Sequence, residues 1–107
     1  MTLRIYNTLT EKKEEFIPLN KNKVKIFTCG PTVYDSPHLG HARTYIFYDV
    51  MIRYLKLKYN VEYIVNITDI DDKIYQRALE LKVDPNHLTT KYTTEFIECI
   101  KQLNIQD

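Results

Sequence analysis

Two histidines that flank a glycine stand out as side chains able to bind a phosphate. His38 and His41 are three residues apart, with Gly40 between them, in the segment TCGPTVYDSPHLGHAR. Imidazole N–H groups donate hydrogen bonds to phosphate oxygens, and a residue without a side chain lets a flat base approach the backbone. The spacing therefore predicts a site for a nucleotide triphosphate. A plainer interpretation stays open, in which His38 caps a helix, His41 lies on the surface and Gly40 relieves a tight bend.

The segment that carries these histidines reads as a strand, a shaped loop and a helix. Residues 24–29 (VKIFTC) are short, β-branched and aromatic, which predicts a buried or half-buried strand. Both glycines of the chain and two of its four prolines fall in the following loop. Apolar residues then recur at helical spacing through HARTYIFYDVMIRYLKLKY. The first turn of such a helix offers N–H groups and a dipole that favour an anion at the carboxyl end of the strand.

A second strand and two more helices are predicted downstream. VEYIVNI, residues 61–67, has the composition and length of a strand, so the chain makes a right-handed β-α-β crossover with parallel strands. Asp69 is placed as the N-cap of the next helix, with Asp72 at its third position. Asp84 followed by Pro85 predicts the start of a third helix. The apolar residues expected along these two helices are Ile70, Ile74, Ala78, Leu81, Leu88, Tyr92, Phe96 and Ile100.

Composition bounds the class of protein. The chain has 107 residues, 44% hydrophobic and 27% charged, which fits one globular core and excludes collagen-like, low-complexity and wholly disordered proteins. A net charge of +1 gives no sign of a nucleic-acid partner. The start lacks the apolar run of a signal peptide and no segment approaches 18 apolar residues, so a cytoplasmic protein without a membrane partner is expected.

The elements divide the chain into three parts. Residues 1–22 contain LRIYNTL and EEFIPL around a charged TEKK tip and predict a flanking hairpin, residues 23–82 form a β-α-β-α unit, and residues 83–107 are helical. A doubly wound domain needs two β-α-β halves, and only the first is visible. We therefore predict an α/β fold, the incomplete first half of a Rossmann-like (HUP-type) nucleotide-binding domain, at the front of a longer chain. Its open sheet edge or apolar surface could support self-association.

Neither cysteine has a partner at metal-site spacing. Cys29 and Cys99 are seventy positions apart, which argues against a disulfide framework or a self-contained zinc site. From the residues alone, Cys29 is expected to be a buried cysteine at a strand end, and Cys99 to be in the core or lightly exposed. The three aspartates of TDIDDK suggest a magnesium site, but helix capping explains them with fewer assumptions.

Longer motifs carry a family resemblance. CGPTVYDSPHLGHARTYIFYDV followed by NITDIDDKI resembles the N-terminal catalytic region of the cysteinyl-tRNA synthetases, a family of class I aminoacyl-tRNA synthetases. The match includes LRIYNTLT and EEF and covers most of residues 3 to 80. The resemblance implies a ligase that activates cysteine with ATP and Mg²⁺, releases pyrophosphate and transfers the cysteinyl group to the terminal adenosine of tRNA(Cys).

The resemblance also implies roles for single residues. His38 and His41 would bind ATP and stabilise charge on its phosphates by positioning and electrostatics. Adenine would pack on Gly40, and Cys29 matches the family's first zinc ligand, whose metal also takes the substrate thiolate and so rejects serine. The implied ATP-binding residues are Pro31, Thr32, His38, Leu39, Gly40 and His41. The implied cysteine-binding residues are Cys29, Gly30, Thr32 and Thr68.

Some features of the family lie outside these residues. The Lys-Met-Ser-Lys-Ser loop is absent and the other zinc ligands are expected beyond Asp107, so the fragment alone is expected to be inactive and to hold zinc weakly or not at all. A ligase that joins cysteine to an amino sugar, as in mycothiol synthesis, is an alternative, although Arg43 and Lys73 look more like the tRNA synthetase. A non-catalytic half-Rossmann binding module is a second alternative.

Overall fold

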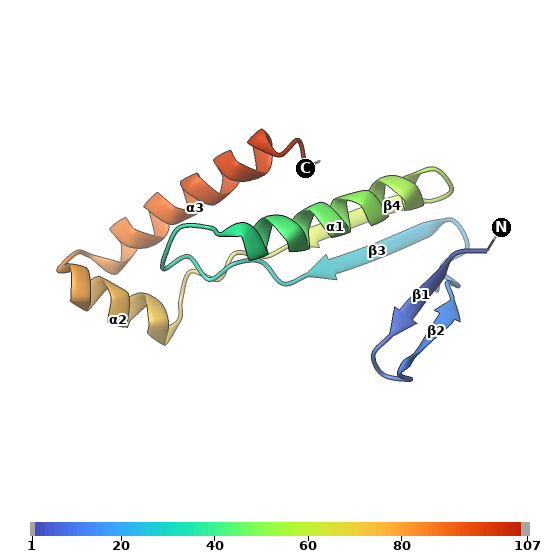
Figure 1. Cartoon of the computed structure of the whole chain (residues 1–107), viewed down its shortest axis with the longest axis horizontal. Coiled ribbons are helices and arrows are strands. Elements are labelled where there is room, and N and C mark those ends of the chain that lie inside the picture. Colours follow the sequence, from blue (N-terminus) through green and yellow to red (C-terminus); the bar gives the residue numbers. More distant parts are fainter. Residues whose placement is uncertain (1, 106–107) are drawn as a thin grey trace.

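The chain begins with a small antiparallel hairpin. The computed structural model describes residues 2–105, and in it β1 (Arg4–Asn7) pairs with β2 (Lys12–Glu15) (Figure 1). The hairpin confirms the predicted pairing, but its turn comes earlier than the predicted TEKK tip. The Asn7 side-chain oxygen accepts from the Leu9 N–H at 3.0 Å, which starts the turn, and Glu11 ends it in the left-handed region with φ 58°. The two lysines of the motif therefore lie in β2.

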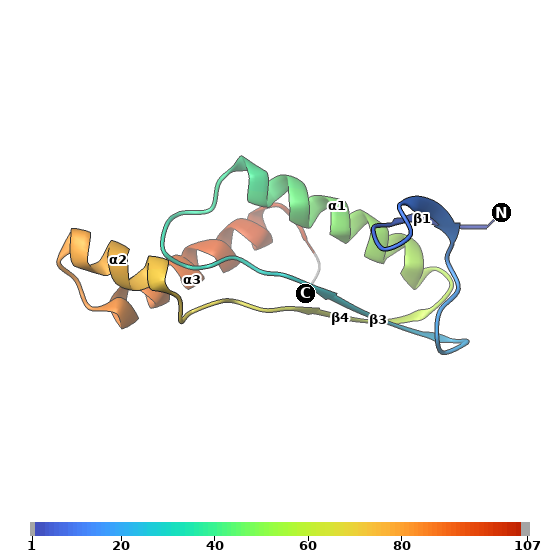
Figure 2. The same cartoon turned by 90° about the horizontal axis from the view of Figure 1, so that it is seen from below.

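A two-stranded parallel sheet forms the centre of the molecule. β3 (Lys23–Thr28) pairs with β4 (Asn60–Val65), and α1 (Leu39–Lys56) connects them across one face of the sheet (Figure 2). This arrangement confirms the predicted parallel β-α-β unit. Alternate strand residues face α1, so Val24 and Thr28 are buried while Phe27 on the opposite face is 61% exposed. The buried apolar stripe of α1 consists of Tyr45, Ile52 and Leu55.

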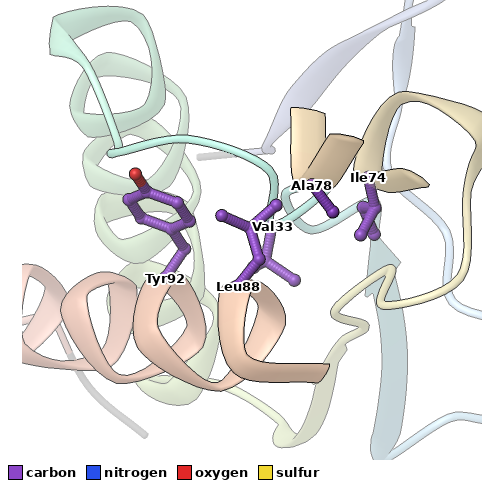
Figure 3. Close-up of a cluster of buried hydrophobic side chains, with 5 residues drawn as sticks. All are labelled: Val33, Ile74, Ala78, Leu88 and Tyr92. Carbon is purple, nitrogen blue, oxygen red and sulfur yellow. The ribbon is translucent and has the colours of Figure 1, made fainter. Parts of the chain in front are cut away.

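Two further helices pack near the carboxyl ends of the strands. They are α2 (Asp72–Leu81) and α3 (Pro85–Gln102), and their shared core also takes in a residue of the loop after β3 (Figure 3). The buried cluster consists of Val33, Ile74, Ala78, Leu88 and Tyr92. Because Val33 is only 2% exposed in this cluster, the two helices anchor the loop that leads to the histidines.

The start of α2 corrects one sequence prediction. The N-cap is Asp71, whose Oδ1 accepts from the Lys73 N–H at 2.9 Å, and not Asp69. The chain stays extended past Asp69 because Thr68 still pairs with Thr32 of the neighbouring loop. Ile70 consequently lies before the helix, 77% exposed, instead of on its apolar face. The predicted start of α3 is confirmed.

The described residues are more extended than a compact domain. The radius of gyration is 16.9 Å, where a compact chain of this length has about 13 Å. The accessible surface is 8334 Å², against about 6,300 Å² for a compact monomer of this mass. The excess includes the sheet face opposite α1. None of the helices in residues 2–105 has the length and apolar content needed to span a membrane.

Candidate functional site

His38 and His41 together cap the N-terminus of α1. His38 is the N-cap, in an extended conformation, and its Nδ1 accepts from the Gly40 N–H at 3.0 Å. The Nδ1 of His41 accepts from the His38 N–H at 3.1 Å, and the ring centroids are 4.1 Å apart. This is a capping box made of imidazoles in place of the usual hydroxyl and carboxylate. The structural role of His38 in the plainer interpretation is therefore real.

These hydrogen bonds also fix the chemistry of both rings. A backbone N–H can only donate, so each Nδ1 is unprotonated and the hydrogen of each neutral ring is on Nε2. Burial, and then the charge of His38, lowers the pKa of His41 below its ordinary value of 6.5. The Nε2 atom of each ring is thus the nitrogen left to donate a hydrogen bond to a ligand.

Gly40 makes room for the first of these rings. A Cβ on Gly40 would lie 2.8 Å from Cε1 and 3.0 Å from Nδ1 of His38. The space left by the absent Gly40 side chain is therefore occupied by the imidazole of His38. The prediction that adenine packs on Gly40 stays untested. The neighbouring Leu39 is 85% exposed at the same helix end.

The sheet changes its bonding where β3 ends. Regular pairing stops at Thr28 and Val65, and the Gly30 N–H then donates to Oδ1 of Asn66 at 2.7 Å. The backbones approach so closely here that a Cβ on Gly30 would lie 1.4 Å from the Asn66 carbonyl oxygen, which no side chain can accept. Asn66 was not singled out from the sequence, although a polar residue inside the β-branched run VEYIVNI is the signal that could have found it.

Pairing resumes two residues later and brings two predicted pocket residues together. Thr32 and Thr68 form a parallel bridge, in which Val33 N–H donates to the Thr68 carbonyl at 3.2 Å and Thr68 N–H to the Pro31 carbonyl at 3.0 Å. The interval between the two paired regions contains Cys29 and Gly30. The residues that the resemblance assigned to a cysteine pocket therefore line one short break in the sheet.

Cys29 is exposed, so the expectation of a buried cysteine is wrong. Its backbone carbonyl accepts from the hydroxyl of Tyr45 at 2.9 Å, and Tyr45 is only 6% exposed. Burial, with smaller contributions from Tyr63 and Cys29, raises the pKa of Tyr45 to about 12, so this hydroxyl keeps its proton at neutral pH. Tyr45 lies on the buried face of α1, and the packing of this helix on the sheet brings its hydroxyl to the end of β3.

An apolar groove lies between the start of α1 and the second half of α3. Its volume is about 300 Å³. Both histidines line it from α1, and Cys99, which is partly buried, lines it from α3. The lining also includes Pro37, Leu39, Ala42, Tyr45, Phe96, Ile100, Gln102, Leu103 and Ile105. Since Tyr45 reaches from this groove to Cys29, one side chain connects the histidine pair to the break in the sheet.

One of the three aspartates after β4 acts as a helix cap. Asp71 caps α2 through its side chain, as described above. Among residues 2–105, no three His, Cys, Asp or Glu side chains are grouped in a way that could hold a metal ion. Any metal at Cys29 would therefore need further ligands from outside these residues.

Comparisons with known proteins give a consistent family. The family model of the class I tRNA synthetase (C) catalytic domain matches residues 15–107. Similar proteins include the cysteine–tRNA ligases of Pyrococcus horikoshii, 57% identical over 107 residues, and of Encephalitozoon cuniculi, 52% identical over 107 residues. These alignments cover 99% and 98% of this chain but 22% of each relative. The chain thus spans about a fifth of the length of the curated relatives it matches.

A solved structure agrees with the fold. Mycobacterium tuberculosis methionyl-tRNA synthetase in complex with methionyl-adenylate superposes with a TM-score of 0.75 at 26% sequence identity. The match covers 79% of this chain and 17% of that protein. The short parallel sheet and its crossover helix therefore have the architecture of a class I Rossmann catalytic domain, as the sequence predicted.

Proposed function

Because the chain belongs to the family of class I tRNA synthetase (C) catalytic domains, we propose that it is the ATP- and cysteine-binding front of a cysteine–tRNA ligase. The reaction would activate cysteine with ATP and Mg²⁺, release pyrophosphate and pass the cysteinyl group to tRNA(Cys). Residues 23–82 are the nucleotide-binding unit in this proposal, with 1–22 as a flanking hairpin and 83–107 as a helical extension. The mutual capping of His38 and His41 is the observation that carries the proposal.

In this proposal the two imidazoles donate hydrogen bonds to the phosphates of ATP. With Nδ1 of each ring occupied by a backbone N–H, Nε2–H is the donor available to a phosphate oxygen. Donors that are fixed before the substrate binds need no reorganisation as charge builds on the phosphate oxygens during adenylate formation. The positive end of the α1 dipole adds to the same field. His38 and His41 therefore stabilise the transition state by electrostatics, without forming a covalent bond.

Cys29 fits the role of one zinc ligand. Its thiol is exposed at the end of β3, and its carbonyl is held by Tyr45. When bound, zinc supplies a soft Lewis acid that accepts a substrate thiolate and discriminates against the hydroxyl of serine. Thr32 and Thr68, paired beside the Cys29–Gly30 break, are suited to contact the rest of the amino acid. The remaining zinc ligands would come from outside residues 2–105.

The proposal is tested by cysteine-dependent exchange of pyrophosphate into ATP in the complete protein. His38→Asn and His41→Gln are the informative variants, because Asn and Gln retain the side-chain acceptors of a helix cap while they remove the imidazoles. We expect each to lower the exchange rate about 100-fold or more with little change in melting temperature. Exchange at the unmodified rate in both variants overturns the histidine roles.

The acceptor of the cysteinyl group needs a separate measurement. The complete protein should form cysteinyl-tRNA(Cys) from the adenylate. Transfer to an amino sugar in place of tRNA assigns the protein to the mycothiol-type ligases, and the absence of any cysteine-dependent exchange overturns the proposed activity altogether.

A further inference from the structure

The peptide group between Cys29 and Gly30 is held at both ends by side chains. Its carbonyl accepts from the Tyr45 hydroxyl at 2.9 Å, and its N–H donates to Oδ1 of Asn66 at 2.7 Å. Both bonds are to one planar unit, which has no rotational freedom of its own. This peptide lies just beyond the end of the regular ladder between β3 and β4. Two side chains, in place of strand backbone, therefore satisfy its carbonyl and its N–H.

Each of the two side chains reaches the peptide from a different element. Tyr45 comes from α1 and lies four residues after His41, which places both on one face of that helix. Asn66 directly follows β4 and its Val65 end. The peptide beside the thiol is therefore tied to the histidine-bearing helix on one side and to the neighbouring strand on the other.

The hydroxyl of Tyr45 has little room to move. Its ring packs edge to face against Phe96 of α3, with centroids 5.3 Å apart at 73°, and the residue is 6% exposed. A tyrosine has only two side-chain torsions to order, so a clamped ring fixes the position of its oxygen. Tyr45 therefore connects the α1–α3 interface to the backbone of Cys29 through a side chain with a fixed position.

We infer that Tyr45 and Asn66 are positioning residues that set the direction of the Cys29 thiol relative to the histidine pair. Rotation of the Cys29–Gly30 peptide would swing the Cys29 side chain, because both share the same Cα. Holding that peptide orders the thiolate before metal or substrate binds. The inference rests on the proposed function, in which Cys29 is a zinc ligand. In it, two residues that are not zinc ligands themselves control the orientation of that ligand.

The test uses the complete protein with Tyr45→Phe and Asn66→Ala, and Tyr54→Phe as the control. Tyr54→Phe makes the same chemical change on the same helix, at an exposed position. We expect both informative variants to lose zinc to a competing chelator about tenfold faster and to raise the KM for cysteine about tenfold. The KM for ATP should stay within twofold, and Tyr54→Phe should match the unmodified protein throughout.

The outcomes separate this inference from the proposed function. If the unmodified protein binds zinc and activates cysteine, and Tyr45→Phe and Asn66→Ala match it in zinc loss and in KM for cysteine, then the inference is wrong and the proposed function stands. If the variants raise both KM values together, the two residues have a general structural role and the inference is again wrong. If the unmodified protein holds no zinc and activates no cysteine, the proposed function fails first.

Discussion

His38 and His41 are held in the same tautomer by backbone N–H groups at the start of α1. Each Nδ1 accepts a backbone N–H, from Gly40 in one case and from His38 in the other, at 3.0 and 3.1 Å. The helix cap therefore leaves the Nε2–H of each ring as the donor for the phosphate site proposed above. The capping interpretation and the proposed phosphate-binding role do not compete, because the cap orients the same two rings that the proposal uses.

The pKa of His41 gives this arrangement a pH dependence. Burial, and then the charge of His38, lowers the pKa of His41 below 6.5. The unfolded chain therefore takes up the proton first as the pH falls below 6.5, so this residue makes the free energy of unfolding decrease with falling pH. Protonation of Nδ1 also breaks the bond from the His38 N–H. An NMR titration of the His41 Cε1 proton should give a midpoint below 6.5.

The same titration has a matched variant. His38→Asn removes the smaller of the two causes and leaves burial in place. The midpoint of His41 should rise in this variant and still lie below 6.5. A midpoint at or above 6.5 in the unmodified protein contradicts the prediction, because burial would then have no effect on this ring.

The two glycines should respond differently to alanine. In Gly30→Ala the new Cβ meets the Asn66 carbonyl oxygen at 1.4 Å, so the strands must separate and we expect a loss of about 2–4 kcal/mol in the free energy of unfolding. In Gly40→Ala the Cβ meets the far side of the His38 ring at 2.8 Å, and the ring can rotate away. Loss of the cap, about 1 kcal/mol, is then offset by the better helix propensity of alanine, about 0.5–1 kcal/mol.

Gly40→Ala should therefore leave stability nearly unchanged while it displaces His38. Urea unfolding measures the first effect, and the rate of cysteine-dependent pyrophosphate exchange in the complete protein measures the second. Equal destabilisation by the two alanine substitutions would refute the distinction between a backbone clash and a side-chain clash.

The sequence predicted the elements well and the break in the sheet poorly. The strands expected at 24–29 and 61–67 are Lys23–Thr28 and Asn60–Val65, because β-branched runs between turn residues depend on local propensity. The break in the sheet beside Cys29 depends on Asn66, whose side chain accepts from the Gly30 N–H across 36 residues of sequence. The hydroxyl contact from Tyr45 likewise depends on how α1 packs on the sheet. Such contacts are tertiary and leave no periodic pattern.

A tertiary contact also decides which aspartate caps α2. Asp69 and Asp71 are both good N-cap residues, and the pairing of Thr68 with Thr32 decides between them by keeping the chain extended. Asp71→Ala should cost about 1 kcal/mol of local stability, whereas Asp69→Ala should cost less than about 0.5 kcal/mol. Hydrogen exchange of the Lys73 amide, which donates to Asp71, reports the difference directly. Faster exchange in Asp69→Ala than in Asp71→Ala would restore the original assignment.

Tyr45 should make the protein less stable at high pH. Its pKa is raised from 10.0 to about 12, chiefly by burial, so the folded state keeps the phenol proton at pH values where the unfolded state has released it. The contribution of the protonated Tyr45 hydroxyl to the free energy of unfolding is complete below pH 10 and is lost as the pH rises from 10 to 12. Tyr45→Phe removes this dependence but also the bond to the Cys29 carbonyl, so the variant should be about 1 kcal/mol less stable at pH 8. Urea unfolding of the two metal-free proteins should show that difference shrinking above pH 10, and a constant difference up to pH 12 would mean that the hydroxyl titrates as if exposed.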